Sequence, residues 1–468
     1  MKKYIYIISF FAFTISLKAQ EKTMELSLKQ AINYALENSY NTKAARNDIK
    51  SAHEKAWETT AIGLPQINGK VDYQNFLKQP VSLLPAAALD NRESVVQTVE
   101  DFFDITRESS PNAPDGFIPV VFGTKQNINA SVTLTQLLFD GSYLVGLQAS
   151  KTFLKISKQA EEKTELITRE AVINAYGNVL VTENSIAILE SNIKILQKNY
   201  TDAKKIYENG LNEEEDVEQL EITLGNLKNQ LSSVVRMKEI AYQMLNLSLG
   251  NSINTGLILT DTLDSLVMSN LELGLISEDF NVSNHIDFRI SENDRETKRL
   301  MMRLEQSKAL PSLSAFVNYG SQGFSDSFSF FNGSQQWFDS SLLGVSLNVP
   351  IFSSFSRKSK TAQAKIALEN ADLRLEETKQ RLNLLAEKAK SDYQLSIENY
   401  NTAQKNLGLS ERIEKKQRIK FFEGISSSFD LLLAQNQLYT QQQNYIQSML
   451  DVISKKAALE NALNLPIK

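Results

Sequence analysis

The chain has 468 residues and a formal net charge of −5, from 50 lysines and arginines against 55 aspartates and glutamates. It contains no cysteine, which excludes disulfides, thiolate nucleophiles and cysteine-ligated zinc or iron–sulfur centres. Its two histidines, His53 and His285, argue against a histidine-built metal site, and the mild acidity argues against a general nucleic-acid binder. We therefore expect neither a cofactor nor a nucleic-acid partner.

The N-terminus has the features of a secretory signal peptide. Lys2 and Lys3 precede an apolar stretch over residues 4–17, and a small residue follows at Ala19. The alternative is a membrane anchor, which needs about 20 apolar residues, and this stretch is shorter. The sequence therefore predicts a signal peptide over residues 1–19 and export of the mature chain.

The mature chain repeats one plan twice. Matching segments occur in the same order at near-equal spacing: Gly63–Ile67 with Ala309–Leu313, Val132–Leu134 with Val345–Leu347, and Tyr207–Leu211 with Phe421–Ile425. Such self-similarity indicates an internal duplication. We predict a first structural repeat over 20–249, an equatorial linker over 250–280 and a second repeat over 281–468. Each repeat would contain a helix, a strand-loop-strand segment, a long helix and a return helix.

Two strands are predicted in each repeat, within residues 66–139 and 311–352. After Pro65 and Pro311, which end the preceding helices, apolar and polar residues alternate. Phe316 interrupts the polar set of the strand after Pro311. Strands of about 10 residues have the length that crosses an outer membrane. The apolar members are Ile67, Val71, Tyr73, Ile128, Ala130, Val132 and Leu134 in the first repeat and Leu313, Ala315, Val317, Tyr319, Leu343, Val345 and Leu347 in the second.

A half-buried sheet in a soluble domain is the alternative, but it leaves the apolar face without a covering layer. Four strands cannot close a barrel alone, since the smallest outer-membrane barrels use eight. Three chains that give four strands each would supply twelve. The loop over 76–127 holds five of the nine prolines, which exclude a long helix there. Within it, the spacing of Val95, Val99 and Phe102 predicts a short amphipathic helix on the barrel mouth.

A very long helix follows the strands of each repeat. Phe139 and Gly210 are 71 residues apart, and Phe352 and Gly424 are 72 apart, with no proline between. A helix of about 70 residues is about 100 Å long. Apolar residues recur at three- and four-residue steps, which is typical of a coiled-coil seam. Return helices are predicted over residues 214–249 and 428–463.

These motifs together resemble the outer-membrane efflux protein family, the TolC-like channels. The resemblance rests on the duplication, on Leu64-Pro65 and Leu310-Pro311 at the strand starts, and on Gly210 and Gly424, each followed six residues later by an aspartate. It implies a mainly α fold with a small β part. Long antiparallel coiled-coil helices would form a trimeric α-barrel, and four strands per chain would contribute to a shared 12-stranded membrane β-barrel.

The resemblance also implies a function and partners. The chain would be the outer-membrane exit duct of a tripartite efflux or type I secretion system, with most of its length in the periplasm. As a homotrimer in outer-membrane lipid, it would passively conduct substrates that an inner-membrane transporter and a periplasmic adaptor deliver. No catalysis is expected. The sequence does not distinguish drug, metal and protein substrates.

The family pattern assigns a periplasmic gate to the second half of the chain. Asp430 matches the aspartate that lines the closed entrance in the family. A second position, commonly aspartate, is Leu433 here. The usual latch joins the aspartate matched by Asp216 to a tyrosine and an arginine, but these positions are Phe421 and Ser426. The usual latch therefore cannot form, and the closed state must be held differently or held less firmly.

The helix tips carry the remaining candidate residues. Gly210 and Gly424 are expected at turns between antiparallel helices, where glycine reaches a positive φ easily. The resemblance implies that these turns, with Leu211 and Ile425, dock the adaptor. An acidic tip is formed by three further residues, which also suit the N-terminus of a helix: Glu213, Glu214 and Glu215.

Two other functions are weighed against the duct. A periplasmic coiled-coil adaptor or structural protein would share the long helices and the signal peptide, but it does not need four amphipathic strands. A secreted enzyme would need a catalytic pattern, and neither His53 nor His285 lies in one. In the linker, Asp261 and Asp264 suggest a solvated loop rather than a metal site.

Overall fold

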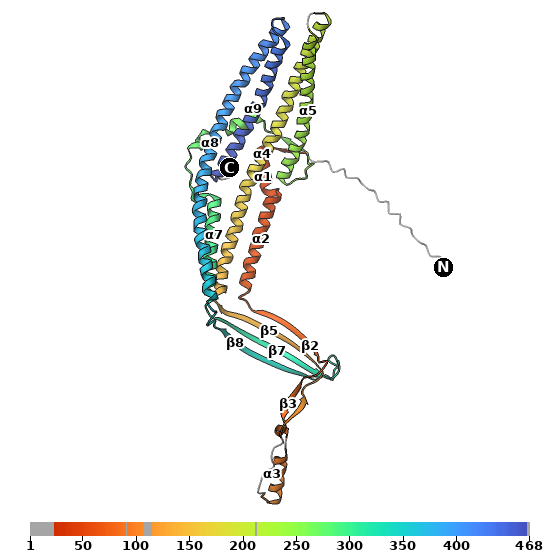
Figure 1. The fold of residues 1–468 in the computed structure, drawn as a ribbon, viewed down its shortest axis with the longest axis vertical. Coiled ribbons are helices and arrows are strands. Elements are labelled where there is room, and N and C mark those ends of the chain that lie inside the picture. The colour runs from red at the N-terminus through yellow and green to blue at the C-terminus, as the bar shows by residue number, and fades with distance from the viewer. Residues whose placement is uncertain (1–22, 90, 107–114, 211–212, 466–468) are drawn as a thin grey trace, which may run out of the picture. The chain divides into compact units, whose positions relative to one another are not determined.

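A computed structural model describes residues 23–89, 91–106, 115–210 and 213–465 (Figure 1). The predicted signal peptide lies outside these residues. The elements in chain order are β1 (Met24–Leu26), α1 (Leu28–Asn38), α2 (Tyr40–Ala61), β2 (Gln66–Asn75), β3 (Val81–Pro85), η1 (Ala86–Leu89), α3 (Arg92–Phe103), β4 (Phe117–Val121), β5 (Gln126–Asp140), α4 (Gly141–Glu208), α5 (Glu214–Leu249), β6 (Leu257–Leu259), α6 (Leu263–Asn270), η2 (Leu273–Ser277), η3 (Val282–Asn284), α7 (Ile286–Ser307), β7 (Ser312–Ser325), β8 (Trp337–Asn348), α8 (Ser356–Phe422) and α9 (Ser428–Ala462).

Two compact units divide the chain, and each draws on both halves of the sequence. The helical unit comprises the residues up to 56, residues 149–302 and the residues from 362 onward. The strand unit comprises residues 57–148 and 303–361. Both predicted repeats therefore contribute to both units.

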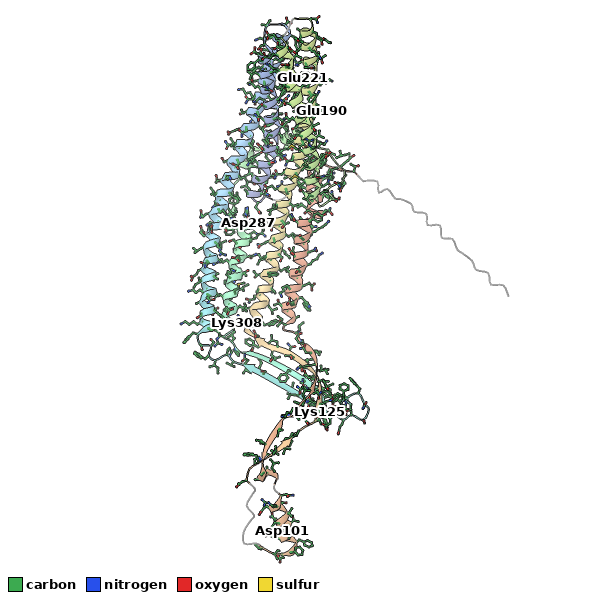
Figure 2. All side chains as sticks on the ribbon, turned by 45° about the vertical axis from the view of Figure 1, so that its right-hand side comes forward. Asp101, Lys125, Glu190, Glu221, Asp287 and Lys308 are labelled. Carbon is green, nitrogen blue, oxygen red and sulfur yellow. The ribbon has the colours of Figure 1, made fainter. Side chains whose placement is uncertain are left out.

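The helical unit contains two long hairpins. α4 has 68 residues and returns as α5 with 36, while α8 has 67 residues and returns as α9 with 35. The mainly helical fold and the long helices are thus confirmed. Exposed charges such as Glu190 on α4 and Glu221 on α5 project from the helices into solvent (Figure 2). Among the described residues, no helix is both long and apolar enough to cross a membrane.

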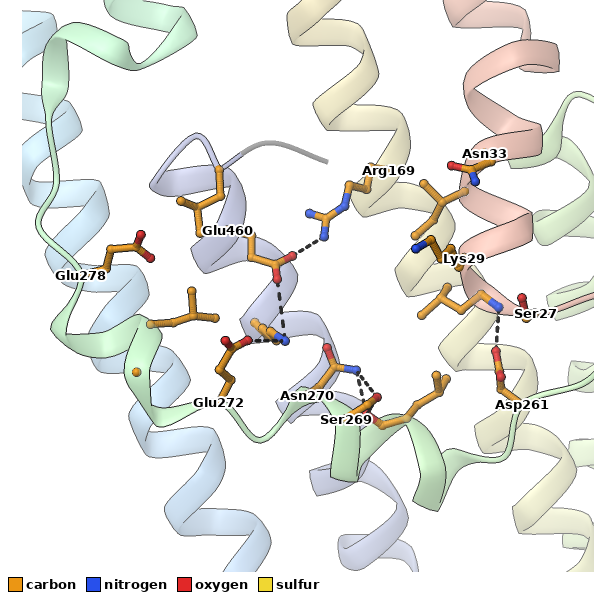
Figure 3. Close-up of a pocket in the computed structure, with 17 residues that line it drawn as sticks. Ser27, Lys29, Asn33, Arg169, Asp261, Ser269, Asn270, Glu272, Glu278 and Glu460 are labelled. Atoms are coloured by element: carbon orange, nitrogen blue, oxygen red, sulfur yellow. Dashed lines mark hydrogen bonds and ion pairs between the residues drawn. The ribbon is translucent and has the colours of Figure 1, made fainter. Parts of the chain in front are cut away.

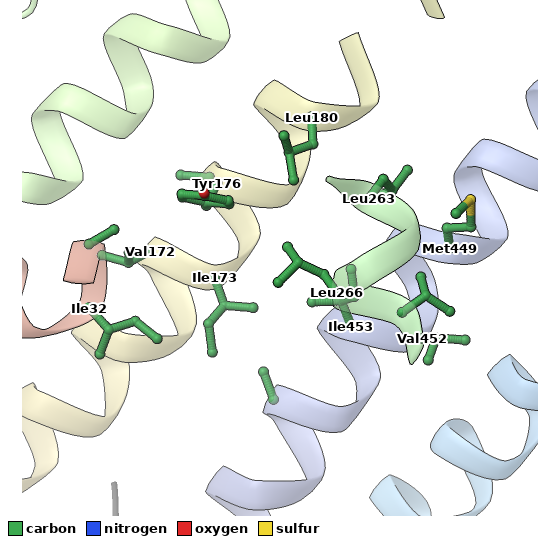
Figure 4. Close-up of a cluster of buried hydrophobic side chains, with 14 of the residues drawn as sticks. Ile32, Val172, Ile173, Tyr176, Leu180, Leu263, Leu266, Met449, Val452 and Ile453 are labelled. Carbon is green, nitrogen blue, oxygen red and sulfur yellow. The ribbon is translucent and has the colours of Figure 1, made fainter. Parts of the chain in front are cut away.

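A hydrophobic core joins the hairpins to the short elements around them (Figure 4). α4 and α8 each place one fully buried tyrosine in this core, and each tyrosine bonds to a neighbouring element. The hydroxyl of Tyr176 on α4 donates to the carbonyl of Leu26 at 3.0 Å. The hydroxyl of Tyr393 on α8 donates to the carbonyl of Asn270 at 2.5 Å. Each phenol therefore satisfies a backbone carbonyl while its ring fills the core.

The predicted linker is more structured than the sequence suggests. Its strand β6 pairs in parallel with β1, so that Met24–Leu26 lies beside Leu257–Leu259. The expectation of a solvated loop at Asp261 is wrong. Its Oδ2 accepts a hydrogen bond from the amide of Leu28 at 2.6 Å and one from the hydroxyl of Tyr176 at 3.1 Å. Asp261 therefore caps the start of α1, where the helix leaves backbone amides unpaired.

The strand unit holds a four-stranded antiparallel sheet in the order β2-β5-β7-β8. Residues directly opposite in this register share a face, and the predicted alternation holds across all four strands. On one face, Ile67 pairs with Leu134, and Val317 pairs with Leu343. On the other face, the amide of Asn318 donates to the hydroxyl of Thr133 at 2.6 Å. The apolar face is open to solvent within one chain. Val71, Leu343 and Val345 are 68%, 75% and 66% exposed.

An apolar residue on the polar face, Phe316, is accommodated by a glycine on the next strand. Phe316 lies directly opposite Gly344, and a Cβ at that glycine would lie 2.4 Å from the ring of Phe316. The glycine therefore leaves room for the aromatic ring across the strand pair.

The proline-rich loop folds into a second small sheet with a helix. β3 pairs with β4, and Leu83 lies opposite Pro119. In a two-stranded sheet every strand is an edge, so that proline is tolerated. The predicted short helix is present as α3, and none of its residues is buried.

We predict that the helical unit loses stability in mild acid through His285. Its side chain is 4% exposed, and burial lowers its pKa below the ordinary value of 6.5. The folded state therefore keeps the imidazole neutral while the unfolded state takes up a proton. Thermal stability should fall as the pH drops below 6.5. Melting curves between pH 7.5 and pH 5, both chosen as roughly bracketing an ordinary histidine pKa, should show a shallower pH dependence for His285→Gln.

The matched control for this prediction is His53→Gln, since His53 is exposed on α2. That variant should keep the pH dependence of the unaltered chain. An unchanged slope in His285→Gln would assign the acid sensitivity to other groups.

Candidate functional site at the helix tips

The turn between α8 and α9 is closed by backbone hydrogen bonds. Gly424 has a φ of +71°. Its amide donates to the carbonyl of Phe421 at 3.0 Å, and the amide of Ile425 donates to that of Lys420 at 2.9 Å. This pair of bonds is a Schellman motif, which requires a left-handed residue at the position of Gly424. Ile425 is left 75% exposed beside the turn.

The turn after α4 uses glycine in the same way. Gly210 has a φ of +74°, and its amide donates to the carbonyl of Tyr207 at 2.7 Å. An added Cβ would meet nothing within 4 Å at Gly210 or at Gly424, so only the backbone conformation demands glycine there. Leu211, predicted beside this turn, lies outside the described residues.

Asp430, the predicted gate residue, also caps α9. The hydroxyl of Ser427 accepts from the amide of Asp430 at 3.2 Å, and the carboxylate accepts from the amide of Ser427 at 3.3 Å. This reciprocal pair is a capping box. The hydroxyls of Ser427 and Ser426 also donate to the carboxylate, at 2.8 and 3.4 Å.

These hydrogen bonds keep Asp430 ionised. The hydroxyl of Ser427, followed by its amide, holds the pKa of this exposed carboxyl below its ordinary value of 3.8. Hydrogen bonds donated to a carboxylate favour its charged form. The side chain therefore presents a fixed negative charge at the first turn of α9.

The acidic run on the other hairpin lies at the start of α5. Glu213 is the N-cap residue, and Glu214, Glu215 and Asp216 occupy the first turn. Carboxylates there meet the positive end of the helix dipole. Glu213 to Glu215 are exposed, whereas Asp216 is half-buried. This geometry explains their presence through helix stability alone.

The other predicted gate residues separate into buried and exposed positions. Phe421 is 8% exposed and belongs to a hydrophobic cluster inside the tip, so its side chain does not reach the surface. Leu433 is 59% exposed. Phe429, which the sequence analysis did not select, is 64% exposed one helical turn before it. The spacing of four residues places both on one face of α9.

A hydrogen bond links the two tips. The hydroxyl of Ser428 at the start of α9 donates to the side-chain carbonyl of Gln219 on α5 at 3.3 Å. Ser426 contacts Asp430 and Gln417 within its own hairpin. The structure thus brings Ser426 and Asp430 together and joins the hairpins through a pair that the sequence analysis did not select.

A cavity of about 890 Å³ lies in the helical unit beside α1, α4, α6 and α9 (Figure 3). Arg169 forms an ion pair with Glu460. The buried Lys456 is 3.2 Å from Glu272 and 3.8 Å from Glu460. The charges therefore neutralise one another and join α4, α9 and the linker. Within the described part of the chain, no cluster of three or more His, Asp or Glu could hold a metal ion.

Comparison with known proteins identifies this architecture. Residues 282–465 match the family model of the outer membrane efflux proteins. VceC of Vibrio cholerae has a TM-score of 0.66 at 16% identity, over 93% of this chain and 95% of VceC. The outer membrane channel CmeC of Campylobacter jejuni has a TM-score of 0.69 at 16% identity, over 93% of this chain and 85% of CmeC.

CusC, described as forming a transmembrane channel, has a TM-score of 0.70 at 16% identity, over 96% of this chain and 95% of CusC. No curated protein matches the chain. At this identity the solved structures establish the fold, and the family model adds the sequence evidence. Together they confirm the predicted family resemblance: residues 282–465 match the outer membrane efflux protein model, and the chain has the fold of the outer-membrane channels.

Proposed function

We propose that this chain is the exit duct of a tripartite efflux or type I secretion system, which passively conducts substrates out through the outer membrane. The open apolar face of the four-stranded sheet carries the proposal. Side chains such as Leu343 and Val345, 75% and 66% exposed, are costly in water and suited to lipid. In a soluble adaptor such a face would remain exposed to water, which is unfavourable.

The sheet also leaves both of its edges unpaired within one chain. β2 and β8 are the outer strands of the order β2-β5-β7-β8. Unpaired strand edges cannot face hydrocarbon, because their backbone groups would lack hydrogen bonds. Pairing of β2 with β8 of the next copy would close the sheet. A homotrimer would then contribute twelve strands, and the helical units would form an α-barrel tunnel in the periplasm.

The hairpin tips would receive the periplasmic adaptor and, through it, the inner-membrane transporter. The exposed Ile425 beside the turn supplies an apolar contact. The ion pairs in the cavity beside α1, α4, α6 and α9 hold α4, α9 and the linker together. Drug, metal and protein cargoes all remain compatible with this duct.

Membrane insertion is tested by placing a charge on either face of β8. Val345 lies on the apolar face, and its neighbour Ser346 lies on the opposite face. Val345→Lys should reduce insertion, because a lysine facing lipid costs about 2–4 kcal/mol near the bilayer centre. Ser346→Lys should insert normally. Fractionation of outer membranes and size analysis of the detergent-extracted trimer give the result. Equal insertion of the two variants, or extraction as a stable monomer with an intact sheet, would reject the duct.

Docking is tested at the turn between α8 and α9. Gly424→Trp forces a bulky residue into a left-handed conformation at the tip. We expect export to be lost while the trimer still assembles. Gly225→Trp is the matched control, since Gly225 is exposed on α5 and has nothing within 4 Å of an added Cβ. Normal export by Gly424→Trp would remove the docking role from this turn.

We further propose that Asp430 forms a ring of three carboxylates at the periplasmic entrance, with Leu433 as an apolar ring beside it. In planar bilayers, a trivalent cation on the periplasmic side should block the channel at neutral pH. Asp430→Asn should relieve the block by about tenfold or more in concentration, because polyvalent cations bind clustered carboxylates. Ser427→Ala should retain the block at neutral pH, since it removes the cap but not the charge.

The pH dependence of the block separates charge from capping. The pKa of Asp430 lies below 3.8 because Ser427 donates to the carboxylate. Ser427→Ala should therefore lose the block at a higher pH than the unaltered chain does, because its carboxylate no longer accepts a hydrogen bond from the hydroxyl of Ser427. If replacing Glu213, Glu214 and Glu215 with glutamine removes the block while Asp430→Asn leaves it unchanged, the cation site belongs to the α5 tip.

A further inference from the structure

α4 and α9 face each other inside the helical unit along an antiparallel seam. Arg169 contacts Glu460 near one end, and Asn192 contacts Gln442 farther along, so residue numbers rise on one helix as they fall on the other. Buried positions on α4 follow one another at steps of three and four: Leu189, Asn192, Leu196, Asn199 and Ala203, with exposures of 2%, 5%, 0%, 3% and 0%. This spacing is the heptad pattern of a coiled coil.

Two layers of this seam are built from amides. Seven residues toward the tip, Asn192 is followed by Asn199 on α4, and Gln442 is followed by Gln435 on α9. Antiparallel helices rise equally per residue, so a step of seven residues from the bonded pair Asn192 and Gln442 carries Asn199 and Gln435 to about the same level. We call these the outer and the inner amide layer, the outer one being nearer the tip.

The two layers differ in their hydrogen bonds. In the inner layer, Nδ2 of Asn192 donates to Oε1 of Gln442 at 2.8 Å. In the outer layer, Nδ2 of Asn199 and both Nε2 and Oε1 of Gln435 are buried without a partner. Gln435 is 1% exposed. Fully buried apolar residues flank the outer layer in the seam: Leu196, Ala203 and Leu431.

An amide buried without a partner loses the hydrogen bonds that water gave it, which raises the free energy of the packed state. A polar cavity large enough to hold water lies close by. A cavity of about 560 Å³ between α4 and α8 is bordered by Asn199 and by four charged residues, Lys198, Asp202, Arg418 and Glu423. A small separation of α9 from α4 would let this water reach both unpaired amides.

We propose that the outer amide layer is a release point for the tip. The first turns of α9 separate from α4 as far as the inner layer, where the bond between Asn192 and Gln442 holds the helices together. Hydration of Asn199 and Gln435 stabilises the separated state. The consequence for conduction rests on the proposed duct: Asp430, five residues before Gln435, moves with the separated segment.

Hydrogen exchange followed by mass spectrometry tests the release on the full-length mature protein in detergent. Asn199→Leu with Gln435→Met replaces both outer amides by apolar groups of similar shape. Exchange of the α9 amides between Ser428 and Ala434 should slow by about tenfold, because the packed state no longer holds unpaired polar groups. Asn192→Leu with Gln442→Met is the matched control and should give no slowing, since that layer is already paired.

Unchanged or faster exchange in the outer-layer variant, or equal slowing in the control, overturns the proposal. Gln435→Met alone should give a smaller slowing in the same direction, and no slowing there also overturns it. This readout does not require a conducting channel. Conductance in planar bilayers is measured on the same variants: slowed exchange without any pore rejects the duct and leaves the release point standing, whereas a pore with unchanged exchange does the reverse.

Discussion

The antiparallel register of α4 against α9 is the constraint on which the helical unit depends. The register is set by Arg169 with Glu460 at one end and by Asn192 with Gln442, 2.8 Å apart, toward the other. Each inserted residue would shift one helix by about 1.5 Å and rotate its faces by about 100°. Because α4 has 68 residues, an error near its start would misplace everything at its tip. The register therefore depends on an unbroken α4, and no proline interrupts its 68 residues.

Much of this fold is readable from the sequence because its signals are long and periodic. Strict alternation gave the four-stranded sheet and its apolar face, and the glycines gave the turns at Gly210 and Gly424. β1 and β6 are not predicted from the sequence, because strands of three residues are too short to show an alternation of apolar and polar side chains. The capping role of Asp261 was invisible for a different reason, since its partner Leu28 lies 233 residues away.

The sequence predicts the positions of the tip residues but not their contacts. The position of Asp430 followed from its distance to the glycine, yet its bonds to Ser427 depend on the conformation of the turn. The family pattern placed Phe421 at the gate but did not show that its side chain is buried inside the tip. The unpaired state of Gln435 could not be deduced at all, because it depends on which residue of another helix lies at the same level. One carboxylate thus serves both the cap and the surface charge, which limits what can replace Asp430 without changing both.

The pairing of β1 with β6 has a consequence for how the chain folds. Synthesis delivers Met24–Leu26 first, whereas Leu257–Leu259, its partner strand, follows only after more than half of the chain. Closing so long a loop is slow, and contacts between distant residues delay folding. α1 and the core around Tyr176 must therefore wait, with apolar surface uncovered, until the linker arrives. Because β1 and β6 pair late, the apolar surface of the first half of the chain is exposed to aggregation until the linker has been synthesised.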